Sequence, residues 1–282
     1  MMGGSGMKRV SVNGIEMAYE EHGHGARPLV LVHGFTGSRR DFAWRVAELA
    51  TTGRVVALDL RGHGDSTNTG DAASYTIEQV ADDLVAFLAA AGIEACDLLG
   101  HSMGGMAVLR AALAAPERIA SLLLMNTAAR CPDGLPRDLI EMAGQAALAV
   151  GTRRLLEIMR ERAPESARTA ADRRLEQSWG EGYWSEWREP NFAALDPVAY
   201  GAFGRSILEQ PSLVPRLGEI DRPTLVMVGG DDASFQEPAR ELLEGIRGAR
   251  GAFFEEAGHQ PQFEAPAAWV EAIRAHLARV RA

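Results

Sequence analysis

The chain has 282 residues and a formal net charge of −9, with 46% hydrophobic and 24% charged residues. This length suits one large α/β domain with a single core, or one domain that carries a substantial insertion. The negative charge argues against a nucleic-acid partner, because binding to phosphate backbones needs concentrated lysine and arginine. The composition is close to that of average globular proteins, so disordered, collagen-like and solenoid classes have little support.

Two cysteines, Cys96 and Cys131, are too few for a disulfide framework, and their spacing fits no zinc or thiol redox pattern. Residues 1–7 are interpreted as an artificial leader ahead of a second start at Met7. Neither a secretory signal segment nor a run of about 20 apolar residues follows. We therefore expect a cytoplasmic protein with no membrane span, present as a monomer or a homodimer.

The order of predicted elements indicates an α/β fold. Alternating residues around Asn13-Gly14 predict an antiparallel pair at the start of the chain. Short apolar runs bounded by turn residues predict strands at 28–33, 54–59, 96–100, 119–125, 223–229 and 251–255. Apolar residues at three- and four-residue spacing predict helices at 40–50, 76–91, 103–114 and from about 265. Strands that alternate with crossover helices imply a mostly parallel sheet.

The alternation stops in the middle of the chain. From residue 130 to about 215 the sequence is rich in arginine and glutamate, has helical character and contains no convincing strand. We interpret this stretch as a helical insertion into an α/β core.

A G-x-S-x-G motif joins a predicted strand to a predicted helix, with Ser102 between Gly100 and Gly104. A serine at such a sharp turn is exposed as a nucleophile, and the helix start directs backbone N–H groups at developing negative charge. The glycines allow the backbone to close around a strained serine. Ser102 is the predicted nucleophile, although the motif alone would also fit a glycine-rich helix start.

A serine hydroxyl is a weak nucleophile, so a general base is expected late in the chain and an acid before it. His259 follows the last predicted strand and precedes the terminal helix, which makes it the predicted base. Asp231 and Asp232 end the strand at 223–229, and both are candidates for the acid that holds the histidine. We favour Asp232 and expect Asp231 to cap or turn the loop.

Acyl-transfer chemistry also needs an oxyanion hole, commonly two backbone N–H groups. One is expected from Met103, directly after the nucleophile. The other is expected from Phe35, in the glycine-containing loop that follows the strand at 28–33. The run Asp-Leu-Arg-Gly-His-Gly-Asp-Ser at 59–66 is interpreted mainly as a structural turn. No zinc motif and no nucleotide-binding glycine motif occurs, so we expect no metal and no cofactor.

Together these motifs resemble the α/β-hydrolase superfamily, in the branch with a serine nucleophile and a helical cap between strands six and eight. The resemblance covers nearly all of residues 8–280. The matching motifs are H-G-F-T-G-S at 33–38, D-L-R-G-H-G-D-S at 59–66, G-H-S-M-G-G at 100–105, G-G-D-D at 229–232 and G-H-Q-P-Q-F-E-A-P at 258–266.

The resemblance implies an eight-stranded, mostly parallel sheet flanked by helices. The core would comprise 8–129 and 216–282, and the cap 130–215. It also places the acid three residues after Gly229, at Asp232. A serine at 102 argues against the epoxide-hydrolase and haloalkane-dehalogenase members, whose chemistry requires a carboxylate nucleophile.

Aromatic residues gather in the insertion, at Trp179, Tyr183, Trp184, Trp187 and Phe192. Caps of this kind lie over the active site, so we predict that Trp179, Trp184 and Trp187 contact the substrate in an apolar or aromatic acyl pocket. The alternative is that these rings form a small core within the cap itself.

The predicted activity is hydrolysis of a carboxylic ester or a related small acyl compound through an acyl-enzyme, as in carboxylesterases. Carbon–carbon bond hydrolysis, lactone opening and elimination like that of the menaquinone-pathway lyase use similar groups and stay open. A ligand sensor that retains all three residues, as in hormone receptors of the superfamily, is the alternative from a different class.

Overall fold

The structure, a computed structural model, describes residues 6–162, 170–180 and 182–282, so residues 1–5 of the predicted leader lie outside the described residues. Its centre is one eight-stranded sheet in the order β1-β2-β4-β3-β5-β6-β7-β8. β1 and β2 pair with each other and β2 with β4 in antiparallel fashion, and all other pairs are parallel. The strands are β1 (Lys8–Val12), β2 (Ile15–His22), β3 (Leu29–Val32), β4 (Val55–Leu58), β5 (Cys96–His101), β6 (Ile119–Met125), β7 (Thr224–Gly229) and β8 (Arg250–Phe254).

The predicted α/β class and mostly parallel sheet are confirmed. Each predicted strand is present with its ends shifted by at most one residue. The predicted helix at 40–50 differs, because it starts as the 3-10 turn η1 (Arg39–Phe42) and becomes α-helical only from Ala43. The turn begins where the Ser38 side chain accepts a hydrogen bond from the backbone N–H of Arg40, which caps the first turn.

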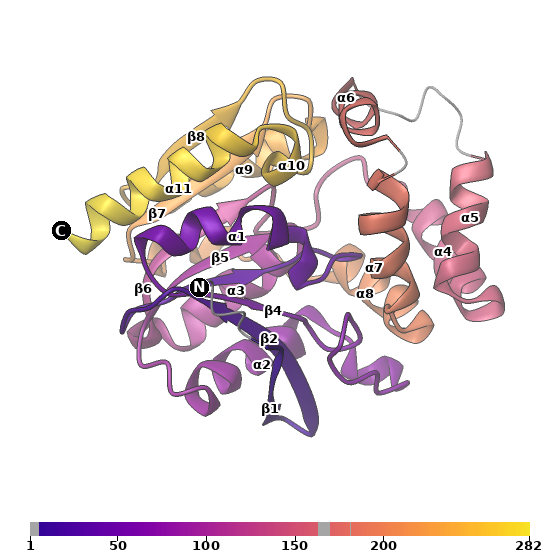
Figure 1. The fold of residues 1–282 in the computed structure, drawn as a ribbon, viewed down its shortest axis with the longest axis horizontal. Helices are drawn as coiled ribbons and strands as arrows, with labels where there is room; N and C mark the ends of the chain where they lie inside the picture. Colours follow the sequence, from indigo (N-terminus) through magenta and orange to yellow (C-terminus); the bar gives the residue numbers. More distant parts are fainter. Residues whose placement is uncertain (1–5, 163–169, 181) are drawn as a thin grey trace.

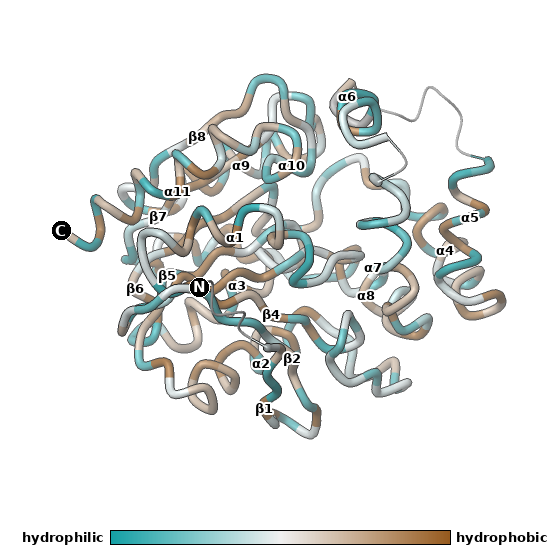
Figure 2. Tube along the Cα trace, in the orientation of Figure 1, coloured by the Kyte–Doolittle hydropathy of each residue, from teal (hydrophilic) through white to brown (hydrophobic). Residues whose placement is uncertain are grey.

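Helices cover both faces of the sheet (Figure 1). One face is covered by α1 (Ala43–Leu49) and α11 (Pro266–Arg281), and the other by α2 (Ile77–Ala90), α3 (Met103–Ala114) and α9 (Ala233–Gly245). The four residues of β3 and the six of β5 are all buried, as expected for parallel strands between two helical layers. Figure 2 shows hydrophobic residues concentrated along these central strands.

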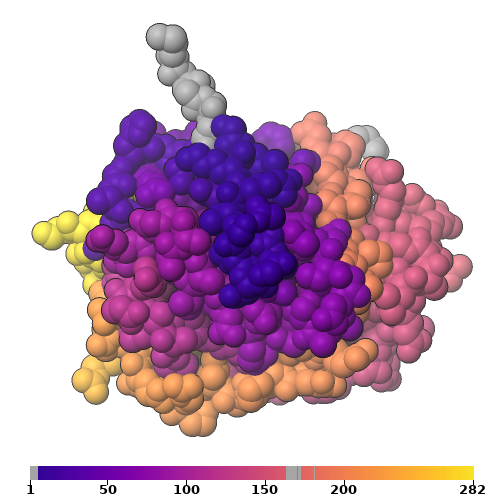
Figure 3. Space-filling model, turned by 90° about the horizontal axis from the view of Figure 1, so that it is seen from below, coloured from indigo at the N-terminus to yellow at the C-terminus, as the bar shows by residue number. Residues whose placement is uncertain are grey.

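The segment between β6 and β7 is helical in its described part. It contains α4 (Arg137–Val150), α5 (Thr152–Arg162), α6 (Ala170–Trp179), the π-helical turn η6 (Tyr183–Arg188), α7 (Glu189–Ala193) and α8 (Pro197–Glu209). In Figures 1 and 3 the pink α4 and α5 form one side of the molecule. In the described parts of the chain, no helix combines the length and the apolar character needed to cross a membrane.

The parallel strands β3, β5, β7 and β8 end at one edge of the sheet. Their carboxyl ends lead to the loop after Val32, to Ser102, to Asp232 and to the loop that holds His259. This edge is where parallel α/β sheets usually bind ligands. The topology therefore brings together four predicted site segments that are far apart in the sequence.

Candidate active site

Ser102 lies in the sharp turn between β5 and α3. Its φ of 52° and ψ of −122° fall outside the regions that non-glycine residues ordinarily adopt. The turn is possible because its neighbours lack side chains. A Cβ on Gly104 would lie 2.3 Å from the backbone oxygen of His33, and one on Gly100 would lie 2.6 Å from the Cα of Gly105. Strain of this kind is typical of functional sites.

Ser102, His259 and Asp232 form a continuous chain of hydrogen bonds. The Nε2 of His259 lies 3.0 Å from the Oγ of Ser102, and its Nδ1 lies 2.7 Å from the Oδ2 of Asp232. A carboxylate only accepts hydrogen bonds, so Nδ1 carries the hydrogen. Nε2 is then free to accept the hydroxyl proton of the serine, which is the arrangement that activates a serine nucleophile.

Of the two predicted acids, only Asp232 reaches the histidine. Its side chain is 10% exposed, and its Oδ2 also accepts a hydrogen bond of 2.5 Å from the Nδ2 of Asn126. Asp231 faces the other way and pairs with Arg174 at 3.0 Å. The resemblance already favoured Asp232, and the hydrogen bonds place this residue beside His259. Asn126 follows β6 directly and was not predicted.

His101 fixes the loop that carries His259. The Nε2 of His101 lies 2.8 Å from the backbone oxygen of His259, so this nitrogen must be the donor. Burial lowers the pKa of His101 to about 3, which keeps the ring neutral. The backbone N–H groups of Gly258 and Gln260 both donate to Glu264. These contacts hold the loop on both sides of His259.

Of the two residues predicted to supply oxyanion donors, Met103 follows Ser102 in the chain, and Phe35 follows Gly34, which lies against Ser102 in space. Met103 opens α3, where the first N–H groups have no partner within the helix. The loop before Phe35 passes directly against the nucleophile, since a Cβ on Gly34 would lie 3.1 Å from the Cβ of Ser102. The carbonyl oxygen of Gly34 shares a peptide group with the Phe35 N–H and accepts a hydrogen bond of 2.8 Å from the Nδ1 of His33, which orients this peptide.

The run at 59–66 forms a buried turn beside this loop. The carboxylate of Asp59 accepts hydrogen bonds from the backbone N–H groups of Arg39 and Asp65 and forms an ion pair with Arg39. Arg61 pairs with Asp83 at 2.5 Å. None of the residues 59–66 is among the described residues that line the cavity over Ser102. This placement agrees with the structural interpretation.

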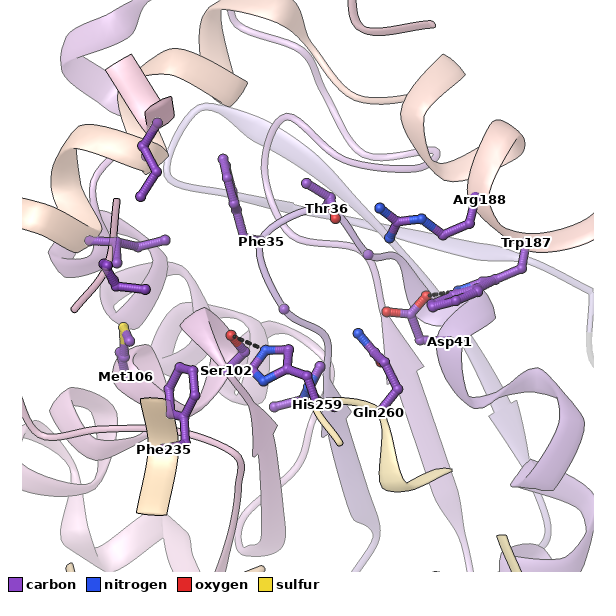
Figure 4. Close-up of a pocket in the computed structure, with 17 residues that line it drawn as sticks. Phe35, Thr36, Asp41, Ser102, Met106, Trp187, Arg188, Phe235, His259 and Gln260 are labelled. Atoms are coloured by element: carbon purple, nitrogen blue, oxygen red, sulfur yellow. Dashed lines mark hydrogen bonds between the residues drawn. The ribbon is translucent and has the colours of Figure 1, made fainter. Parts of the chain in front are cut away.

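A cavity of about 340 Å³ opens over Ser102 and His259. This volume is at the lower end of the range for small-molecule sites. Residues of the core and of the segment between β6 and β7 line it together, and the second group comprises Leu135, Ile140, Trp187, Arg188, Gly204 and Ile207. Figure 4 shows Met106 and Phe235 on one side of Ser102 and His259, and Asp41, Trp187 and Arg188 on the other.

Of the three predicted cap tryptophans, Trp187 alone is among the described residues that line the cavity. Trp179 packs edge-on against Trp44 and Phe263, at centroid distances of 4.9 Å and 5.2 Å. Trp184 packs edge-on against Tyr183, and the guanidinium group of Arg160 lies over its ring. The two therefore belong to an aromatic cluster that joins this segment to Phe263 of the α/β core, which differs from the alternative of a core within the cap alone.

The π-helical turn explains why Trp184 and Trp187 differ. Residues three apart share a face in an α-helix, but the wider turn of a π-helix separates them. The prediction grouped both rings together only because they lie close in the sequence. Several residues that line the cavity were not predicted at all, namely Thr36, Asp41, Met106, Arg188, Phe235 and Gln260.

Asp41 is a buried carboxyl group at one end of the cavity. Its Oδ1 accepts hydrogen bonds of 2.8 Å from the Nε1 of Trp187 and from the Nδ2 of Asn191. The Oγ of Ser38 donates to Asn191 at 2.6 Å. Burial raises the pKa of Asp41 from 3.8 to about 6, although the two donors and Arg188 oppose the shift. This network joins the loop after β3 to η6 and α7.

Asp41→Asn is expected to change how stability depends on pH. Between about pH 4 and pH 6 the unfolded Asp41 loses its proton while the folded one keeps it, so the parent loses stability as the pH rises. Asparagine keeps an oxygen for Trp187 and does not titrate. As the pH rises from about 4 to about 6, the free energy of unfolding of the variant should therefore increase by about 3 kcal/mol relative to that of the parent.

Urea unfolding of both proteins at a series of pH values measures this difference. Asp82→Asn, at an exposed position on α2, controls for the loss of a surface carboxylate. If the free energies of unfolding of Asp41→Asn and the parent differed by a constant amount from pH 4 to pH 6.5, the pKa of Asp41 would not be raised in the folded protein.

A linked serine, histidine and aspartate at the carboxyl edge of a mostly parallel sheet define the α/β-hydrolase class of protein. The chain belongs to the α/β-hydrolase fold family, since the family model described as "alpha/beta hydrolase fold" matches residues 27–266. The family predicted from the motifs is thereby confirmed.

Individual proteins are similar over most of the chain. A thermophilic esterase from Thermogutta terrifontis, solved with malate bound, has a TM-score of 0.82 and 28% identity, with 98% of this chain and 99% of that one covered. The enol-lactonase from Burkholderia xenovorans LB400 also has a TM-score of 0.82, with 27% identity and coverage of 96% and 100%.

A curated relative is the dihydrolipoyllysine-residue acetyltransferase component of the acetoin cleaving system of Cupriavidus necator. It is 30% identical over 271 residues, which make up 94% of this chain. The chain spans about two thirds of that relative's length.

Proposed function

We propose that the protein is a serine hydrolase that cleaves small carboxylic esters, lactones included, through an acyl-enzyme intermediate. The observation that carries this proposal is the hydrogen-bonded chain from Ser102 through His259 to Asp232 at the base of the cavity. The similarity to an esterase and to an enol-lactonase supports it, because a lactone is a cyclic ester.

In the first half-reaction His259 Nε2 takes the hydroxyl proton while the Oγ of Ser102 bonds to the carbonyl carbon. The N–H groups of Phe35 and Met103 would stabilise the oxyanion of this tetrahedral intermediate. His259 then gives the proton to the departing alkoxide, which leaves an ester on Ser102 and a free alcohol.

In the second half-reaction a water molecule replaces the alcohol. His259 takes one proton of the water as its oxygen bonds to the acyl carbon. The second tetrahedral intermediate expels the Oγ of Ser102, which recovers its proton from His259, and the carboxylic acid departs. Asp232 stabilises the imidazolium in both halves.

We further propose that residues 130–215 act as a cap over this site. Six described residues of the segment line the cavity, and Trp187 binds the core residue Asp41 directly. Because the cavity is small and one end is apolar, short acyl or alcohol groups should fit better than long ones.

Steady release of p-nitrophenol from p-nitrophenyl esters of increasing acyl length tests the activity. We expect multiple turnovers, with kcat/KM highest for short chains and falling when the chain exceeds the cavity. A single stoichiometric burst without turnover would instead favour a ligand sensor. A complete lack of reaction with esters and lactones would favour carbon–carbon bond hydrolysis or elimination.

A further inference from the structure

The two ends of the cavity differ in chemistry. Met106 and Phe235 lie towards one end, and the lining also includes the apolar residues Leu135, Ile140 and Ile207. Towards the other it comprises Thr36, Asp41, Trp187, Arg188 and Gln260. Ser102 and His259 lie between the two groups (Figure 4). A substrate that spans the cavity would therefore place an apolar part on one side of its reacting carbonyl and a polar part on the other.

Among the described residues, Arg188 is the charged group at the polar end that has no hydrogen-bond or ion-pair partner. Its guanidinium carbon lies 5.3 Å from the ring centroid of Trp187 and 5.0 Å from that of Phe192. Its Nε is buried and has no hydrogen-bond partner. Within the described residues it also forms no ion pair, and a buried unpaired donor on a charged group is costly.

The neutral groups beside Arg188 add further donors. The Oε1 of Gln260 already accepts a hydrogen bond from Gln262 at 2.7 Å. The amide N–H groups of Gln260 can therefore donate to a ligand in the cavity. In Figure 4 the amide nitrogen of Gln260, the guanidinium of Arg188 and Thr36 face the same space. Asp41 is the acidic group at this end, and its Oδ1 is occupied by two N–H donors. Arg188 and Gln260 therefore present N–H donors at this end, while the Oδ1 of Asp41 is already used by the protein.

We propose that the substrate of this hydrolase carries a carboxylate, which Arg188 binds at the polar end of the cavity with the help of Gln260 and Thr36. A planar carboxylate matches the fork of N–H donors on a guanidinium, and it would satisfy the unpartnered Nε. This inference rests on the proposed function, because it names the substrate class of the same site.

Asp41 acts as a positioning residue in this scheme. It fixes the Trp187 ring through the Nε1 hydrogen bond, and the Arg188 side chain rests on that ring. Its negative charge opposes a second carboxylate, but two neutral donors and the nearby guanidinium offset that charge. A substrate ammonium bound by Asp41 is the competing arrangement, and the test below includes it.

The test compares matched esters that differ only in charge. On the acyl side these are p-nitrophenyl pentanoate, mono-p-nitrophenyl glutarate and the corresponding ester with a terminal ammonium. On the alcohol side they are phenyl acetate and m-acetoxybenzoate. Each is measured with the parent, with Arg188→Met, which keeps the length of the side chain, and with Arg160→Met. Arg160 stacks on Trp184 outside the cavity and serves as the matched control.

We expect the parent to prefer the carboxylate member of at least one series. Arg188→Met should lower the ratio of kcat/KM for the carboxylate ester to that for the neutral ester by about 10- to 100-fold, the range for a hydrogen-bonded charge. Arg160→Met should leave this ratio unchanged. A ratio that Arg188→Met does not alter in either series, or a parent preference for the ammonium ester, would overturn the proposal.

Binding separates this inference from the proposed function. Calorimetry with glutarate and with neutral glutaramide, on the parent and on Arg188→Met, needs no turnover. Glutarate binding that Arg188→Met abolishes supports the anion site even if no ester reacts, in which case only the proposed function fails. Turnover of neutral esters with no glutarate binding and no carboxylate preference leaves the proposed function standing and overturns the inference.

Discussion

Ser102→Ala is expected to lower kcat for ester hydrolysis by about 10⁵- to 10⁶-fold, the effect seen when a serine hydrolase loses its nucleophile. Without the Oγ no acyl-enzyme can form, and His259 has no serine hydroxyl to deprotonate. What remains is water attack on a bound substrate, assisted by binding and by the two N–H groups. Steady-state release of p-nitrophenol at saturating ester measures this loss.

The variant should remain folded, because alanine removes one oxygen without adding volume. Thermal unfolding and the binding of a slowly hydrolysed ester verify this point. Ser212→Ala, at an exposed loop position, is the matched control and should keep parental kcat. If Ser102→Ala retained more than about a hundredth of the parental turnover, another group would have to be the nucleophile.

The parts of the site that could be predicted lie at the ends of buried parallel strands. Each of these strands leaves a clear apolar signal, and their carboxyl ends meet at one edge of the sheet whatever their distance in sequence. Phe35, Ser102 and the pair of aspartates follow such strands within three residues, and His259 lies five residues after the more exposed edge strand β8. Their approximate placement therefore followed from strand order alone.

The polar end of the cavity could not be predicted, because it depends on contacts between distant segments. Asp41 lies in an Arg-Arg-Asp sequence that looks exposed, yet it is buried and contacts Trp187 and Asn191, which lie 146 and 150 residues later. Arg188 is one of many arginines in a stretch whose charge pattern is typical of a solvated helix face. The π-helical turn that directs it has no recognised sequence signal.

The same reasoning separates the two aspartates. They are adjacent and equally polar, so the preference for Asp232 in the sequence rested mainly on the resemblance to the family motif. The choice follows from the tertiary partners, since Asn126 and His259 lie on one side of the loop and Arg174 on the other.

Asp232→Asn is expected to lower kcat by about 10⁴-fold, with little change in KM. In the parent the Oδ2 of Asp232 fixes the hydrogen on Nδ1 of His259 and stabilises the imidazolium that forms when Ser102 is deprotonated. An asparagine amide can instead donate to Nδ1, which puts the hydrogen on Nε2, where it blocks proton transfer from the serine. Asparagine has nearly the same volume as aspartate. The loss of activity therefore comes from the missing negative charge and from the altered tautomer of His259.

Asp231→Asn is the matched control for this prediction, because it makes the same chemical change at the adjacent residue. Asp231 pairs with Arg174, and both side chains are at least one third exposed, so the pair contributes about 1 kcal/mol or less to stability. The control should therefore keep kcat within about twofold of the parent. A larger loss in Asp231→Asn than in Asp232→Asn would assign the acid to the other residue, and equal small losses would mean that His259 acts without a carboxylate.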